Sequence, residues 1–355
     1  MVGALVVSAE SGTAAPRIVG EGWHGRYGGP HAEIVALEAA GEAARGGTLV
    51  VTLEPCCHHG KTPPCTNAVV AAGIRRVIVA TLDPFAAVNG GGVEALRRAG
   101  VDVVVGPGEA AARRLIAPFR MLVEQARPWV VAKWAMSLDG RVATEDRESR
   151  WISSVESRAL VHELRGRVDG ILCGIGTALA DDPLLTARPA GPRRAVRIVL
   201  DGAARLPLDG RLVRTCREVP LLVATGPTAP AENLRALEAA GCEVWHSGET
   251  DATGRLVALL RELGSRRLTN LLVEGGPTVL GGFADAGLID EVWAFVAPLL
   301  IGGATAPSSL AGAGVRPLAA APAVEIEEVS RSGADVFVRG LVRRATGVTS
   351  RGCRG

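Results

Sequence analysis

The stretch from Thr52 to Cys65, TLEPCCHHGKTPPC, contains three cysteines and two histidines, a dense group of metal-binding side chains. Cys56 and Cys65 are nine positions apart, a separation that many loops allow. A structural zinc site needs four protein ligands, often as two Cys-x-x-Cys pairs, and the sequence has no second pair. From this stretch alone, a closed structural site, an open catalytic site and a chance grouping all remain open.

A third ligand comes from upstream. His31 and Glu33 lie in Pro-His-Ala-Glu, directly before the apolar run IVALEAA, and Cys65 opens the run TNAVVAAG after two prolines. Both positions are predicted helix starts, where free N–H groups and the helix dipole favour thiolate over thiol. His31, Cys56 and Cys65 would then bind zinc and leave a fourth position for water, which is the catalytic arrangement.

Glu33 is too close to His31 in sequence to be a comfortable fourth ligand, but it can reach a bound water and shuttle its protons. The zinc deaminase signature H-x-E…P-C-x-x-C follows this logic, although here eight residues separate the cysteines. The alternative is that His-x-Glu is only a surface helix start. Cys57, His58 and His59 are expected to be loop residues near the site.

His-Ala-Glu followed by Thr-Leu-Glu-Pro-Cys-x-His-x-Gly-x-Thr-Pro-Pro-Cys resembles the deaminase half of the bifunctional pyrimidine deaminase/reductase family of riboflavin biosynthesis. The resemblance implies hydrolytic removal of the 2-amino group from a diaminopyrimidinone that carries a ribosylamino 5′-phosphate. It implies one zinc ion per chain, bound by His31, Cys56 and Cys65, with Glu33 as the proton donor. The residues that it places against the substrate are His24, Lys61 and Asp83.

Residues 268–282, LTNLLVEGGPTVLGG, read as a buried strand that ends in Gly-Gly-Pro and turns into a helix. Glycines let a ligand approach the backbone, Pro277 suits the first helical position, and the helix N-terminus can hold a phosphate. A plain strand-to-helix turn is the alternative. The stretch Gly174–Thr177 is not a Rossmann fingerprint, because the third glycine is missing.

Five motifs of this second half resemble the reductase half of the same family, whose fold is similar to dihydrofolate reductase. They are residues 133–141, 149–152, 174–177, 181–188 and 273–276. The resemblance implies hydride transfer from NADPH to C1′ of the ribosylamino group. It implies NADPH contacts by Ala135, Trp151, Thr177, Asp181, Gly276, Pro277, Thr278, Val279, Leu280, Gly281 and Gly282. It implies substrate contacts by Ser149, Arg165, Leu185, Arg188 and Glu274.

Two arginines, Arg165 and Arg188, suit a single monophosphate because each guanidinium can bind phosphate through two hydrogen bonds. Without the resemblance, both arginines could equally be surface charges of a helix and a loop.

The elements that must position these residues alternate between Val/Ile-rich strands and Ala/Leu/Arg-rich helices. One predicted helix covers residues 109–125, and residues 323–342 read as an antiparallel edge hairpin. The predicted fold class is α/β, with a cytidine-deaminase-like three-layer domain before a dihydrofolate-reductase-like domain. The predicted ranges are 1–126 for the deaminase, 127–342 for the reductase and 343–355 for a disordered tail.

Composition limits the partners. With 39 Lys and Arg against 37 Asp and Glu, the net charge of +2 offers no basic surface for nucleic acid. No apolar run reaches the roughly 18 residues that cross a membrane, and seven scattered cysteines do not suggest a disulfide framework. We therefore expect a cytoplasmic enzyme with a small-molecule substrate, no nucleic-acid or membrane partner, and a homo-oligomeric state.

The chain departs from the family pattern at two places. It begins at Met1-Val2-Gly3, where the family has a helix and then Asn-Pro-x-Val-Gly, so we expect the start codon to lie upstream and one sheet face to lack its helix. Phe85 replaces the asparagine of the family's Asp-Pro-Asn. Two alternatives to the bifunctional enzyme therefore stay open: a reductase with an impaired zinc-bound scaffold, and a nucleic-acid deaminase with an accessory domain.

Overall fold

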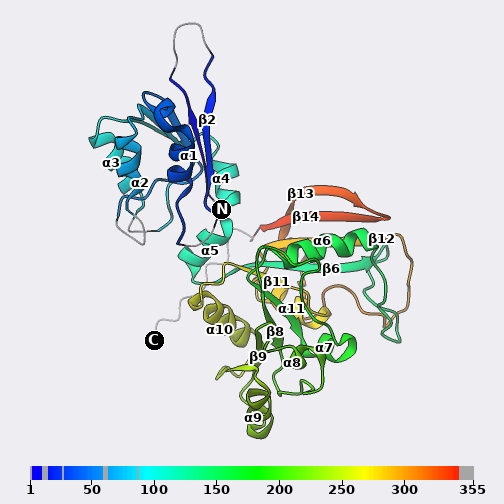
Figure 1. The fold of residues 1–355 in the computed structure, drawn as a ribbon. Coiled ribbons are helices and arrows are strands. Elements are labelled where there is room, and N and C mark those ends of the chain that lie inside the picture. Colours follow the sequence, from blue (N-terminus) through cyan, green and yellow to red (C-terminus); the bar gives the residue numbers. More distant parts are fainter. Residues whose placement is uncertain (1, 10–14, 26–27, 59–62, 86–87, 344–355) are drawn as a thin grey trace. The chain divides into compact units, whose positions relative to one another are not determined.

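A computed structural model describes residues 2–9, 15–25, 28–58, 63–85 and 88–343 of the chain. It divides into two compact units, Met1–Gln125 and Ala126–Gly355, each of which is described here by itself (Figure 1). The predicted tail therefore lies almost wholly outside the described residues. No helix within these ranges has both the length and the apolar character that a membrane span requires.

The first unit is built on a five-stranded sheet with the order β2-β1-β3-β4-β5. Strand β1 pairs antiparallel with both of its neighbours, whereas β3, β4 and β5 are parallel. The strands are β1 (Gly3–Val7), β2 (Ile18–Trp23), β3 (Thr48–Val51), β4 (Arg76–Val79) and β5 (Asp102–Val105). The helices are α1 (Ala32–Ala40), η1 (Gly41–Ala44), α2 (Cys65–Ala71), α3 (Gly91–Arg98), α4 (Glu109–Leu115) and α5 (Ala117–Gln125).

The helix predicted over residues 109–125 is two helices in the structure, α4 and α5. Ile116, which separates them, is the C-cap residue of α4 and is 1% exposed. The apolar residues keep a helical spacing on both sides of Ile116, so the sequence pattern did not show the break. A buried Ile116 is compatible with one continuous helix or with two.

Two glycines of β2 set the position of α1. A Cβ at Gly20 would lie 2.2 Å from the carbonyl oxygen of Ala36, and a Cβ at Gly22 would lie 2.2 Å from that of Ala32. Only glycine allows the helix backbone to approach the strand this closely. The first turn of α1, which carries Glu33, is therefore held directly on the sheet.

The second unit is built on a nine-stranded sheet with the order β10-β9-β8-β7-β11-β6-β12-β14-β13. The first seven strands of this order are parallel. The strands are β6 (Trp129–Ser137), β7 (Gly170–Gly174), β8 (Val196–Leu200), β9 (Leu221–Thr225), β10 (Glu243–His246), β11 (Asn270–Val273), β12 (Glu291–Ala297), β13 (Ala323–Ser332) and β14 (Asp335–Arg343). The helices are α6 (Val155–Arg165), α7 (Ile175–Asp181), α8 (Arg211–Arg214), α9 (Ala231–Ala240), α10 (Ala252–Ser265), α11 (Pro277–Asp285) and η2 (Leu318–Ala320).

The predicted edge hairpin is confirmed, since β13 and β14 pair antiparallel and β13 is the outer strand. The α/β class predicted for both units is also confirmed: helices connect the parallel strands in each sheet (Figure 1).

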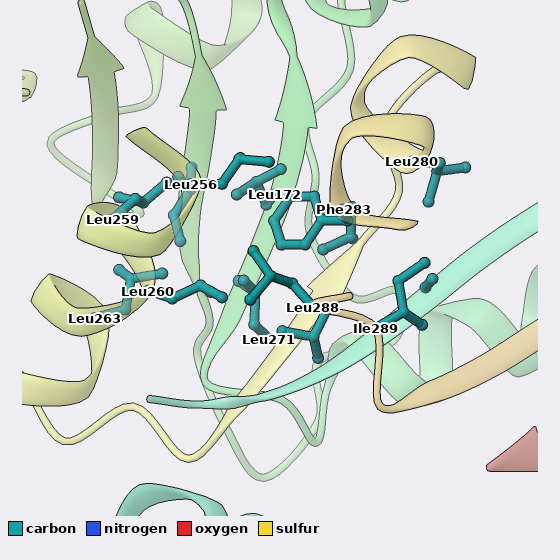
Figure 2. Close-up of a cluster of buried hydrophobic side chains, with 14 of the residues drawn as sticks. Leu172, Leu256, Leu259, Leu260, Leu263, Leu271, Leu280, Phe283, Leu288 and Ile289 are labelled. Atoms are coloured by element: carbon teal, nitrogen blue, oxygen red, sulfur yellow. The ribbon is translucent and has the colours of Figure 1, made fainter. Parts of the chain in front are cut away.

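One face of the second sheet is covered by α10 and α11, and their contact with it is almost entirely aliphatic. Figure 2 shows Leu172 of β7 and Leu271 of β11 among Leu256 and Leu260 of α10 and Phe283 of α11. Only 3% of the residues are aromatic, and this core is accordingly built mainly from aliphatic side chains. Because both helices follow strands directly, their N-termini lie at the carboxyl ends of the parallel strands, where α/β proteins bind ligands.

Candidate active sites of the two domains

The three predicted zinc ligands lie together. His31 is the N-cap residue of α1, Cys65 is the first residue of α2, and Cys56 lies in the segment between β3 and α2. The Nδ1 atom of His31 is 3.1 Å from the Sγ atom of Cys65 and 3.5 Å from that of Cys56. All three ligand atoms lie within 4.8 Å of one another, a spacing that suits one tetrahedral ion.

The pKa values of the Cys56 and Cys65 thiols are shifted in opposite directions. The Cys65 thiol and its backbone N–H, 3.4 Å from the Cys56 sulfur, both donate to Cys56. These hydrogen bonds lower the pKa of Cys56 to about 4, even though burial opposes the shift. The same pairing, together with burial, raises the pKa of Cys65. A thiolate beside a thiol and an imidazole is a donor set that fits zinc, which replaces the remaining thiol proton when it binds.

Glu33 lies beside this group, in the first turn of α1, and its side chain is 3% exposed. Burial raises the pKa of its carboxyl above the usual range, and the charge of His31 only partly opposes the shift. A hydrogen bond with the Cys65 side chain also opposes the rise in the pKa of this carboxyl. A buried carboxyl with a raised pKa next to a metal group is suited to accept and return protons.

Glu54 is a residue of this site that the sequence reasoning missed. Its carboxylate is 3% exposed and accepts three backbone N–H groups, from Asp83 at 3.2 Å, Gly90 at 2.9 Å and Val93 at 3.0 Å. It therefore joins the segment after β3 to the loop before α3. The only signal in the sequence was its place in Leu-Glu-Pro-Cys.

The residues predicted to contact the deaminase substrate are placed as follows. His24 packs edge-on against the His31 ring, with ring centroids 5.5 Å apart, and its Nδ1 is 3.0 Å from the carbonyl oxygen of Pro30. Asp83 is partly buried, and burial raises the pKa of its carboxyl. Lys61 lies outside the described residues.

Phe85, where the family has asparagine, is 47% exposed. Its backbone N–H donates to Oδ1 of Asp83 at 2.9 Å, and its ring centroid is 6.4 Å from that of His58. The backbone geometry at this position is thus anchored, while the side chain presents an apolar ring.

In the second unit, Arg165 and Glu274 form a partly buried bidentate pair, with Nε–Oε1 at 2.6 Å and Nη2–Oε2 at 2.9 Å. Burial raises the pKa of Glu274, but Arg165 and Lys133 outweigh it, so that the net shift is downward. Arg165 therefore meets a carboxylate of the protein, and its predicted contact with a substrate phosphate stays a prediction.

Lys133 was absent from the predicted site, although it opens one of the reductase motifs. It lies on β6 with its amine 5.8 Å from the centroid of the Phe295 ring. Burial lowers the pKa of this amine, and Glu274 opposes the shift. A buried lysine with a lowered pKa beside a carboxylate is a candidate proton donor.

Arg188 lies at the outer side of this group. Its Nη2 atom is 3.4 Å from Nε2 of His162, and the Nδ1 atom of His162 is 3.2 Å from the carbonyl oxygen of Thr186. Burial lowers the pKa of His162, and the charges of Arg165 and Arg188 lower it further. Arg188 is exposed and contacts an imidazole, whereas Arg165 is paired with Glu274, so Arg188 is the guanidinium of this group that suits an anion.

Some residues of the predicted stretch Gly276–Gly282 line a cavity in the structure, and others are buried. Thr278, Val279 and Gly282 line a cavity of about 200 Å3 at the carboxyl ends of β8, β9 and β10. Leu280 is 1% exposed and belongs to the core in Figure 2, and a Cβ at Gly281 would lie 1.0 Å from the carbonyl oxygen of Ala311. The Leu280 side chain thus belongs to the core, and the predicted contacts of Leu280 and Gly281 with NADPH stay predictions.

The start of α11 packs closely against the ends of β7 and β11. A Cβ at Gly174 or at Gly275 would lie 2.6 Å from the side chain of Val279, so both strand ends pack closely against the helix start. Gly276 is the N-cap residue and Pro277 follows at the first helical position. The Val279 side chain therefore fills the space beside both glycines, and a diphosphate would have to meet the backbone N–H groups at the N-terminus of α11 itself.

The remaining predicted residues come from several separate segments of the second unit. Trp151 is 69% exposed, with the Arg158 guanidinium 4.5 Å from its ring centroid, and Asp181 accepts a hydrogen bond from Arg150 at 3.0 Å. The others lie on or beside β6, α7 and the segments next to them: Ala135, Ser149, Thr177 and Leu185. Their contacts with NADPH and substrate stay predictions.

Curated relatives align with nearly the whole chain. A riboflavin biosynthesis protein RibD from Aquifex aeolicus is 40% identical over 338 residues, which covers 95% of this chain and 90% of the relative. RibD of Escherichia coli is 38% identical over 333 residues, covering 90% and 88%.

Solved structures agree with the fold. RibD of Acinetobacter baumannii (form 1) superposes with a TM-score of 0.83 at 32% identity, covering 97% of this chain and 92% of that one. The diaminohydroxyphosphoribosylaminopyrimidine deaminase/5-amino-6-(5-phosphoribosylamino)uracil reductase of Thermotoga maritima gives 0.81 at 34% identity, covering 96% and 91%.

Two family models match the two units. Residues 1–81 match the cytidine and deoxycytidylate deaminase zinc-binding region, and residues 128–338 match the RibD C-terminal domain. With the geometry above, these matches define an enzyme that joins a zinc-dependent deaminase to an NADPH-dependent reductase and acts on a small molecule. The chain belongs to the RibD family of bifunctional deaminase/reductases in riboflavin biosynthesis.

Proposed function

We propose that the chain first removes the 2-amino group of 2,5-diamino-6-(5-phosphoribosylamino)pyrimidin-4(3H)-one by hydrolysis and then reduces the ribosyl chain of the product to a ribityl chain. The similarity to the Thermotoga maritima enzyme supports this choice of substrates. The observation that carries the proposal is the Glu33 carboxyl, 3% exposed, beside the three-ligand group.

For deamination, His31, Cys56 and Cys65 would hold the zinc ion. When bound there, zinc lowers the pKa of a water molecule to about 7 and so supplies a nucleophile at neutral pH. Glu33 accepts a proton from this water as its oxygen bonds to C2 of the pyrimidine ring. Glu33 gives this proton to the ring nitrogen. It then takes the second proton from the new hydroxyl group on C2 and gives it to the departing amine, so that C2 becomes a carbonyl carbon, one water is consumed and one ammonia is released.

For reduction, Thr278, Val279 and the start of α11 would hold NADPH, which supplies a hydride when bound. The C1′–O4′ bond of the ribose breaks as C1′ receives the hydride. Lys133 gives its proton to O4′, which becomes the 4′-hydroxyl of the ribityl chain. Glu274, fixed by Arg165, holds the Lys133 amine in its protonated form through their opposite charges. Arg188 is proposed to bind the 5′-phosphate.

A second candidate is a reductase whose first unit is only a zinc-bound scaffold. Phe85 supports it, because a phenyl ring cannot make the substrate hydrogen bond that the family's asparagine would make. Losing one hydrogen bond in a polar site costs about 1 to 3 kcal/mol, or roughly 5- to 150-fold in rate.

The test is a two-part assay of the purified chain with zinc. Ammonia release is measured with the diaminopyrimidinone substrate, and NADPH oxidation is measured separately with the deaminated product. Both activities together support the bifunctional enzyme, and treatment with a chelator should remove ammonia release alone. NADPH oxidation without ammonia release favours the scaffold, and the absence of both refutes the proposed substrates.

We also propose a cytoplasmic homo-oligomer without a nucleic-acid partner. The need for NADPH and the six free cysteines of the described residues suit a reducing compartment. The net charge of +2 argues against nucleic acid. Exposed Ile326 and Val329 on the outer strand β13, 52% and 64% exposed, support self-association, which analytical ultracentrifugation would measure.

A further inference from the structure

The cavity beside α11 lies at one flank of the reductase site. Its walls come from the ends of β8, β9 and β10 and from α10 and α11. Lys133 on β6 and Glu274 after β11 lie on the other side of β7 in the sheet order. A dinucleotide whose nicotinamide met Lys133 and whose diphosphate crossed the start of α11 would therefore extend its adenosine half toward this cavity.

The lining is mostly uncharged, formed by glycines and by apolar side chains such as Leu200, Ala224 and Trp245. The carboxylate of Asp201 also borders the cavity, but its Oδ2 atom accepts the Leu206 N–H at 2.8 Å and its Oδ1 atom is 4.0 Å from Nε of Arg205. Asp201 is thereby held to the loop that follows β8 through Oδ2, whereas its buried Oδ1 atom has no hydrogen-bond partner among the described residues. Among the residues that line the cavity, Arg255 carries the positive charge.

Arg255 lies in the first turns of α10 and is held from one side. Its Nη1 atom donates to the carbonyl oxygens of Thr250 at 2.6 Å and Glu249 at 3.5 Å. Within the described residues no carboxylate lies within ion-pair distance of Arg255, and its Nε and Nη2 atoms have no protein acceptor. The side chain is thus oriented by backbone carbonyls while two donors stay available to a ligand.

NADPH differs from NADH by one phosphate, on the 2′-oxygen of the adenosine ribose. A guanidinium with free donors is the side chain best suited to bind such a phosphate, through two parallel hydrogen bonds. We infer that Arg255 binds the adenosine 2′-phosphate and is the residue that makes this reductase prefer NADPH over NADH. The inference rests on the placement of NADPH in the proposed function, and it adds a residue that neither the motifs nor the resemblance indicated.

The test measures binding to the full-length, zinc-loaded chain in the absence of substrate. Dissociation constants for NADPH, NADH, 2′,5′-ADP and 5′-AMP are determined by calorimetry for the wild type, Arg255→Gln and Arg255→Lys. The control is Arg261→Gln, an exposed arginine on the same helix that does not line the cavity. NADH affinity and thermal unfolding report whether each variant stays folded.

In Arg255→Gln the dissociation constants for NADPH and 2′,5′-ADP should rise about 10- to 150-fold, as expected for loss of hydrogen bonds to a charged group. Those for NADH and 5′-AMP should stay within about 2-fold, and Arg255→Lys should be intermediate because a point charge replaces a bidentate group. An unchanged preference for NADPH in Arg255→Gln, or an equal loss for both coenzymes, overturns the role of Arg255. A wild type that binds NADPH and NADH equally also overturns the inference, whereas a wild type that binds neither coenzyme would refute the proposed reductase function.

Discussion

Replacing Glu33 by glutamine should abolish deamination while leaving the rest of the molecule unchanged. Glutamine keeps the size of the side chain and removes its capacity to accept a proton. Because Glu33 is 3% exposed, bulk water has no access with which to take over proton transfer. Proton transfer by a positioned side chain contributes about 10²- to 10⁴-fold, which equals roughly 3 to 5 kcal/mol of activation free energy.

The enclosed position of Glu33 places the expected loss toward the upper end of this range. Burial also raises the pKa of its carboxyl, which makes it a better proton acceptor than an exposed glutamate. The kcat of ammonia release should therefore fall by about 10³- to 10⁴-fold. The kcat of NADPH oxidation with the deaminated product should stay the same, because the residues proposed for reduction all belong to the second unit.

The assay compares Glu33→Gln with Glu38→Gln, an exposed residue of the same helix α1. Ammonia release is followed at saturating substrate, and zinc content is measured on the same samples. The reasoning is refuted if Glu33→Gln retains more than about a tenth of the wild-type kcat with full zinc content. Loss of zinc in Glu33→Gln would instead mean that the carboxylate holds the metal group together and is not the proton shuttle.

Three further changes test other parts of the argument. Gly22→Ala, whose Cβ would lie 2.2 Å from the carbonyl oxygen of Ala32, should lower the free energy of unfolding by about 1 to 3 kcal/mol in a denaturant titration, whereas Gly25→Ala, with no atom within 4 Å, should be neutral. Lys133→Met should reduce the kcat of reduction by about 10²-fold or more. Because the pKa of Lys133 is lowered and its protonated form is the acid, wild-type kcat should fall as pH rises through that pKa, and a flat profile would exclude Lys133 as the donor. Phe85→Asn should raise kcat/KM of deamination by roughly 10-fold at constant zinc content, and no change would show that Phe85 is harmless.

The sequence located the metal group because its information is local. Histidine and cysteine types, prolines before helix starts and the positions of His31 and Cys65 are all short-range features. The two helix starts were predicted to converge, and the 3.1 Å separation of His31 Nδ1 and Cys65 Sγ agrees with this.

The sequence could not predict which side chains of the reductase site pair with one another, because these pairs join distant parts of the chain. Arg165 and Glu274 are 109 positions apart, and no local pattern tells which carboxylate will bury a given guanidinium. Lys133 has the same difficulty, since only the packing of β6 beside β11 brings its amine near Glu274. The sequence did not indicate a role for Arg255, because an arginine in an amphipathic helix is usually a solvent-exposed charge. Only the cavity that it lines in the structure indicates one.

The role of Glu54 bears directly on how the replacement at Phe85 should be interpreted. Its carboxylate holds the backbone N–H groups of Asp83, Gly90 and Val93, and none of these bonds involves the side chain at position 85. The N–H of Phe85 itself is bonded to Asp83. Asp83, Gly90 and Val93 are thus held through their backbone whether residue 85 is asparagine or phenylalanine. Any deficit in deamination must then come from the missing side-chain amide, since the loop and the ligand group are already in place.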